Sequence, residues 1–83
     1  MARRKLEQIT QSAGPIGTFV RLRRKQLGYT QQQLSERSGV GLRFVKELEL
    51  GKPTLRLDKV NQLLDFFGYE VAPVKKAKGA LDD

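Results

Sequence analysis

Residues 30–51 constrain the fold of this chain more than any other part of its sequence. Thr30 and Gln33 have the spacing of a capping box, in which each side chain bonds the backbone N–H of the other residue. This pair predicts a helix over residues 31–38. Gly39 follows directly, and glycine tolerates the left-handed backbone that a sharp turn requires.

A second short helix is expected over residues 42–50. Gly41 stands at its N-cap position, where glycine is acceptable but weaker than Ser or Asn, and Gly51 ends it. The core-facing apolar residues expected in this segment are Leu34, Val40, Val45 and Leu48. Two short helices joined in this way form a helix-turn-helix, whose second helix enters the major groove of DNA.

One further helix is predicted on each side of this motif. Gly14-Pro15 opens the first, over about residues 15–27, and Gly28 closes it as a left-handed cap. Its apolar positions are Ile16, Phe19, Val20 and Leu27, with Leu22 fitting the period less well. Pro53 and Thr54 start the next segment, whose helix should end near Gly68. Its apolar stripe consists of Leu57, Val60, Leu63, Leu64 and Phe67.

Three features of the sequence suggest contacts beyond a single core. Residues 69–72 alternate between apolar and polar and precede Pro73, which predicts a short strand. A lone strand needs a partner, and the same strand of a second copy is the obvious one. Phe44 and Phe66 are expected either to pack on the core or to form a patch for a partner.

Eighty-three residues allow one small domain, which buries only about 60% of its unfolded surface and gains stability by dimerising. Residues 1–13 form a basic arm, either disordered or weakly helical. Residues 14–74 form the DNA-binding and dimerisation domain. Residues 75–83 are expected to be a disordered tail.

Charge and composition narrow the function. The net charge is +7, of which residues 1–30 carry +6, a footprint that suits phosphate binding. Cysteine and histidine are absent, so no disulfide, metal site, cofactor or catalytic constellation is expected, and an enzyme is not predicted. No apolar run approaches the roughly 20 residues of a membrane span, and no apolar stretch follows the basic start as in a secretory signal. A cytoplasmic protein is expected.

Residues 15–68 resemble the Xre/Cro family of phage-repressor-type helix-turn-helix domains. The resemblance implies an all-α domain of four to five helices, completed here by the one predicted C-terminal strand. The matching residues are Ile16-Gly17, Arg24, Leu27-Gly28, Thr30-Gln31, Leu34, Ser38-Gly39-Val40, Val45, Leu48-Glu49 and Gly51-Lys52.

A closer likeness is to HipB-type antitoxins, the DNA-binding partners of HipA-type serine/threonine kinase toxins. It implies a homodimer closed by a two-stranded intermolecular sheet, autorepression at an inverted-repeat operator, and capture of a HipA-like kinase. The residues that carry it are Gly41-Leu42-Arg43-Phe44-Val45, the run from Gly51-Lys52-Pro53-Thr54 to Val60, and Phe67-Gly68-Tyr69-Glu70-Val71.

The exposed face of the second helix of the motif supplies the candidate base contacts, which are Leu42, Arg43, Lys46 and Glu47. The guanidinium of Arg43 can bond guanine O6 and N7 together, and Leu42 can touch a thymine methyl. Glu47 can accept a hydrogen bond from cytosine N4, or it can simply pair with Arg43 or Lys46. The alternative for all four residues is a solvated helix face.

Phosphate contacts are expected from Gln31, at the positive N-terminal end of its helix, and family resemblance places a contact there too. The other phosphate candidates are Arg21, Arg23, Lys25, Lys52 and Arg56. The resemblance also implies that Arg24 and Glu49 form a structural ion pair. The expected dimer strand consists of Tyr69, Glu70, Val71 and Ala72.

The sequence therefore predicts a homodimeric, DNA-binding repressor that serves as the antitoxin of a kinase toxin-antitoxin module. Two other functions stay open. One is a stand-alone repressor without a toxin, and the other is an adaptor that uses the fold for protein contacts.

Overall fold

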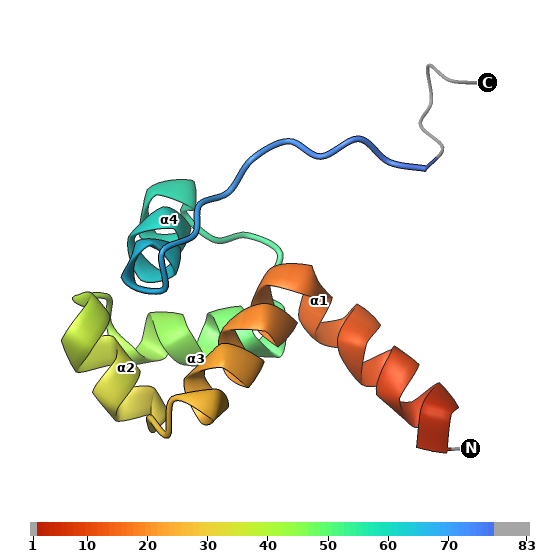
Figure 1. The fold of residues 1–83 in the computed structure, drawn as a ribbon, viewed down its shortest axis with the longest axis horizontal. Coiled ribbons are helices and arrows are strands. Elements are labelled where there is room, and N and C mark those ends of the chain that lie inside the picture. Colours follow the sequence, from red (N-terminus) through yellow and green to blue (C-terminus); the bar gives the residue numbers. More distant parts are fainter. Residues whose placement is uncertain (1, 78–83) are drawn as a thin grey trace.

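The computed structural model describes the backbone of residues 2–77 and the side chains of residues 14–77. This part of the chain forms four helices, α1 (Ala2–Gln26), α2 (Gln31–Ser38), α3 (Leu42–Leu50) and α4 (Leu57–Phe66), as Figure 1 shows. The predicted all-α architecture is confirmed for these residues.

Helix α1 is two helical segments joined at a kink. Gly14 has φ 74° and ψ 169°, outside the helical region, and Pro15 opens the second segment. That segment ends at Gln26, and Gly28 follows with φ 76°, close to the predicted helix of residues 15–27. Residues 2–13 adopt the helical alternative expected for the arm, and Figure 1 shows them running away from the other helices.

Local signals set the bounds of α2 and α3. The Gln33 N–H donates to Thr30 Oγ1 at 3.0 Å, and the Thr30 N–H donates to Gln33 Oε1 at 2.9 Å, which completes the predicted capping box. Gly39 and Gly51 end the two helices with φ 84° and 86°, in the left-handed region. Both predicted helices are confirmed, and they end close to the positions expected.

The core lies where α3 packs between α1 and α2, with α4 packed against α2. A buried Leu or Val side chain contributes about 1.5–3 kcal/mol to folding, so these contacts hold the motif in shape. The buried apolar residues are Val20, Leu34, Val40, Val45, Leu48, Val60, Leu63 and Leu64, and Phe44 packs partly buried against them.

Several apolar residues predicted for the core lie at its edge instead. Leu57 is 60% exposed because it begins α4, beyond the elements that cover Val60 and Leu63. Leu27 is exposed because it lies past the end of α1, and Ile16 is also exposed. Phe66 lies near the surface, with its ring centroid 6.0 Å from that of Tyr29.

The described single chain contains no strand at residues 69–72, where one is predicted, because two of its backbone N–H groups bond elsewhere within the chain. The Tyr69 N–H donates to the Leu64 carbonyl, and the Val71 N–H donates to Asn61 Oδ1 at 2.8 Å. The chain then continues without regular structure to residue 77. From residue 78, the predicted tail lies outside the described residues. Across the described part of the chain, no helix combines the length and apolar character needed to cross a membrane.

Candidate nucleic-acid interface

Helix α3 has one buried and one exposed face. Val45, Leu48 and Glu49 are buried, so the opposite face is left to solvent. The predicted base contacts fall on or beside this open face, with Arg43 and Lys46 exposed and Leu42 and Glu47 partly buried. Leu50, which sequence reasoning missed, continues the face and is 78% exposed. Its spacing of four and seven residues from Lys46 and Arg43 was the available signal.

The structure joins two of these residues to a third in one ion cluster. Arg43 Nε lies 3.4 Å from Glu47 Oε2, and Lys52 Nζ lies 3.2 Å from the same oxygen. The hydrogen bond from Lys52, with the nearby charge of Arg43, lowers the pKa of the Glu47 carboxyl. The link to Lys52 was not predicted, because it depends on how the chain turns after Gly51.

Behind this face lies a buried ion pair that ties three helices together. Arg24 Nε and Nη2 donate to the two carboxylate oxygens of Glu49, at 2.8 and 2.9 Å. Arg24 Nη1 also donates to the Tyr29 carbonyl, and the Gln31 amide donates to Glu49 Oε1 at 3.2 Å. The bond to Glu49 raises the pKa of Arg24. Since both charges are buried, this network fixes α3 relative to α1 and to the start of α2.

The N-terminus of α2 offers backbone donors to an anion. Thr30 caps the Gln33 N–H, while the N–H groups of Gln31 and Gln32 bond to no acceptor among the described residues. Such groups, at the positive end of the helix, suit a phosphate oxygen. The Gln31 side chain is held by Glu49, which positions this end of α2.

The other side chains predicted to contact phosphates do not form one cluster in the structure. Arg21 and Lys25 are exposed on α1, and Arg23 Nη1 donates to Gln26 Oε1 at 3.1 Å. Arg56 pairs with Asp58 at 2.7 Å and lowers the pKa of that carboxyl. Only Lys52, of this group, reaches a residue of the exposed α3 face.

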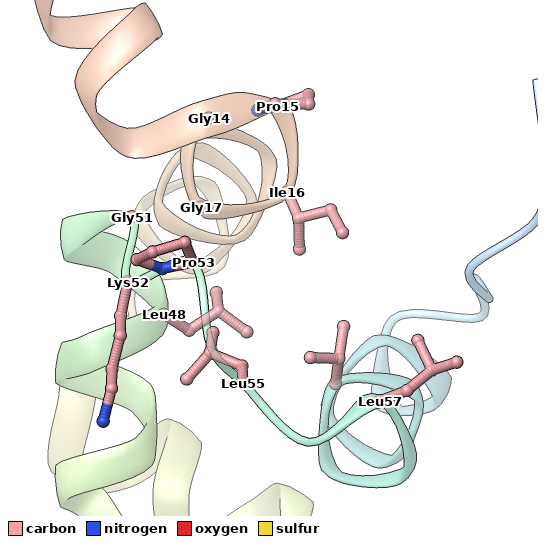
Figure 2. Close-up of a pocket in the computed structure, with 11 residues that line it drawn as sticks. Gly14, Pro15, Ile16, Gly17, Leu48, Gly51, Lys52, Pro53, Leu55 and Leu57 are labelled. Atoms are coloured by element: carbon pink, nitrogen blue, oxygen red, sulfur yellow. The ribbon is translucent and has the colours of Figure 1, made fainter.

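A hollow of about 320 Å³ lies beside the kink of α1 (Figure 2). Pro15 and Ile16 border it on one side and Leu55 and Leu57 on the other, while the Lys52 side chain extends away from it. A second hollow, of about 210 Å³, shares Pro15 and Ile16 and reaches Tyr69. The lining is apolar and carries no converging polar groups, so it suits packing rather than chemistry. Sequence reasoning did not predict it.

The comparisons with known proteins agree with this geometry. The model of the helix-turn-helix family matches residues 20–74, which is more than half of the chain. The chain belongs to the helix-turn-helix family. This family, of Xre/Cro type, consists of DNA-binding transcription regulators, and α2 and α3 form the helix-turn-helix of the present chain.

A relative supports this assignment. The uncharacterized HTH-type transcriptional regulator y4mF of Sinorhizobium fredii is 42% identical over 66 residues, which cover 76% of this chain and 87% of that protein. No solved structure matches the chain.

Proposed function

We propose that this helix-turn-helix protein is a homodimeric, sequence-specific repressor that binds an inverted-repeat operator. The observation that carries the proposal is the open face of α3, where Arg43 projects into solvent with a 90% exposed side chain. The buried Arg24–Glu49 pair ties α3 to α1, and the bond from the Gln31 amide to Glu49 ties α3 to the start of α2. Rigid presentation of a few side chains is what reading of base edges requires.

In the proposed complex, the N-terminal part of α3 lies in the major groove. Arg43 bonds guanine O6 and N7, Leu42 contacts a thymine methyl, and Lys46 contacts base edges or the adjacent backbone. Glu47 lies within reach of the same bases. Phosphates bind at the N-terminus of α2 beside Gln31, with Lys52, Arg21, Arg23, Lys25 and Arg56 as further contacts.

The test of base reading is Arg43→Ala. A duplex selected by the wild-type protein from a random-sequence library serves as the probe, and affinity is measured by fluorescence anisotropy. We expect a loss of about 1–3 kcal/mol and relaxed preference at one base position per half-site. Equal weakening on every sequence would make Arg43 a phosphate anchor only.

The affinity of the wild-type protein for DNA should also fall steeply with salt concentration, whereas an adaptor protein would show no such DNA binding.

The homodimer that we propose pairs residues 69–72 of two copies. The N–H groups of Tyr69 and Val71 are bonded within their own chain. Those of Glu70 and Ala72 have no acceptor among the described residues. Alternate residues of an extended chain point to opposite sides, so the unbonded edge can pair with the same segment of a second copy. A dimer built in this way would place its half-sites about one helical turn apart.

The antitoxin role rests on the resemblance of residues 41–45 and 51–60 to HipB-type proteins. It adds capture of a HipA-like kinase and repression of the protein's own operon. Co-expression with the neighbouring genes, followed by pull-down of this protein, tests it. A stoichiometric, kinase-sized partner is expected. Its absence, together with tight and salt-sensitive binding to the protein's own promoter, would leave a stand-alone repressor.

A further inference from the structure

Glu47 is an unusual residue for a surface that faces DNA. Its carboxylate lies on the open side of α3, where a negative charge is repelled by phosphates. Yet its side chain is only 28% exposed, and a single oxygen, Oε2, holds both Arg43 Nε and Lys52 Nζ. A carboxylate that costs affinity for every DNA sequence calls for a compensating role.

The contact geometry suggests that role. Arg43 contacts Glu47 through Nε, at an ion-pair distance of 3.4 Å, while its two terminal amino groups bond to no acceptor among the described residues. Those amino groups can reach guanine O6 and N7 together. The pair spans one turn of the same helix, so it exists before DNA binds.

Lys52 donates to the same carboxylate oxygen, Glu47 Oε2. It comes from the segment after α3 rather than from α3 itself, so Glu47 is tied to two elements. A free arginine loses rotamer entropy when it is fixed against a base. A side chain that is already tethered loses less. Water is excluded once DNA binds, and the ion contacts strengthen in the lower dielectric.

We infer that Glu47 is a positioning residue for base reading, which orients Arg43 toward guanine while Lys52 anchors the carboxylate. This inference rests on the proposed function, in which α3 enters the major groove. It assigns a specificity role to Glu47 that differs from direct bonding to cytosine N4. The second carboxylate oxygen, Oε1, remains an acceptor, so the experiment is designed to separate the two roles.

The test compares Glu47→Ala, Glu47→Gln, Arg43→Ala and the double variant on the library-selected duplex. The duplex is varied one base pair at a time, and a duplex of unrelated sequence reports non-specific binding. Asp65→Ala, which removes one exposed acid from α4, is the matched charge control. Thermal melting verifies that each variant is folded.

Two results are expected of Glu47→Ala. Discrimination at the guanine read by Arg43 falls about three- to tenfold, the size typical of coupled neighbours, while affinity for the unrelated duplex rises. The double variant discriminates no less than Arg43→Ala alone. Glu47→Gln, which keeps a neutral acceptor, falls between wild type and Glu47→Ala. Asp65→Ala changes neither quantity.

Two outcomes would overturn the inference. Unchanged discrimination in Glu47→Ala would reduce Glu47 to a surface ion pair. Loss of discrimination at a cytosine position, instead of at the guanine, would mean that Glu47 contacts a base directly. Failure of the proposed function would be distinguishable from failure of this inference. In that case Arg43→Ala would cause no loss of discrimination at any one base position, whatever the effect of the Glu47 variants.

Discussion

The buried pair of Arg24 and Glu49 is the residue-level feature on which the motif most depends. A charge left alone in an interior is far costlier than a pair is stabilising, because it loses its hydration without gaining a partner. Here Glu49 accepts bonds from two Arg24 nitrogens and from Gln31. Removal of Arg24 therefore strands a buried carboxylate.

We expect Arg24→Ala to lower the free energy of unfolding by about 3 kcal/mol or more, measured by urea denaturation. Arg21→Ala, which removes the same charge from an exposed position of α1, should change stability by less than about 0.5 kcal/mol. An apolar replacement of both partners, Arg24→Met with Glu49→Leu, should recover most of the loss. Equal effects of Arg24→Ala and Arg21→Ala would show that the pair is energetically unimportant.

The ionisation of Glu47 gives a second prediction at this scale. The hydrogen bond from Lys52 and the charge of Arg43 lower its pKa below the ordinary 4.5. A lowered folded-state pKa means that the carboxylate contributes to stability above about pH 4.5, and that this contribution is lost as pH falls through the folded-state value. An NMR titration should find Glu47 below 4.5, and Lys52→Ala should move it back toward that value. If the titration midpoint of Glu47 were unchanged in Lys52→Ala, Lys52 would not interact with the Glu47 carboxylate in solution.

At the scale of elements, the glycines that end the helices differ in their surroundings. Gly28 and Gly39 both have positive φ, 76° and 84°. A Cβ on Gly28 would meet nothing within 4 Å, whereas one on Gly39 would lie 2.9 Å from Gln62 Nε2. That amide donates to the Ser38 carbonyl and ties α4 to the turn after α2. A Cβ on Gly39 would therefore displace the end of a flexible side chain and break its hydrogen bond, in addition to the backbone strain.

We predict that Gly28→Ala costs about 1 kcal/mol, the left-handed strain alone. Gly39→Ala should cost about 1 kcal/mol more, because Gln62 must swing away and lose its hydrogen bond. Chemical denaturation of both variants measures the difference. In a Gln62→Ala background the two glycine substitutions should cost the same, and a persistent difference would place the extra strain elsewhere in the turn.

The helices also show which parts of the fold could be predicted from the sequence. Helices α2 and α3 were predictable because their signals are local. Thr30 with Gln33 marks the start of α2, and Gly39 and Gly51 mark the ends of the two helices. The exposure of Leu57 was not predictable, because a periodic apolar stripe does not show which of its residues another helix covers. The link of Lys52 to Glu47 likewise depends on the path of the chain after α3.

At the scale of the whole molecule, apolar surface remains beside the end of the described fold. Ile16 and Tyr69 line the smaller hollow and are 36% and 52% exposed, and Phe19 lies with its ring centroid 4.7 Å from that of Tyr69. The extended residues 69–72 begin at this surface. A second copy that pairs with them would therefore also cover apolar side chains, which is the arrangement a small domain with a limited core needs.

The backbone donor of Ala72 provides a test of such a dimer with little effect on the monomer. Ala72→Pro removes an N–H that has no acceptor among the described residues, and it keeps Val71 extended. We expect sedimentation equilibrium to show weaker dimerisation, with the helical circular dichroism unchanged. Ala77→Pro, the same substitution outside residues 69–72, should leave the dimer intact. If both variants dimerise as wild type does, pairing through residues 69–72 is excluded, and the dimer contact must lie on another part of the surface.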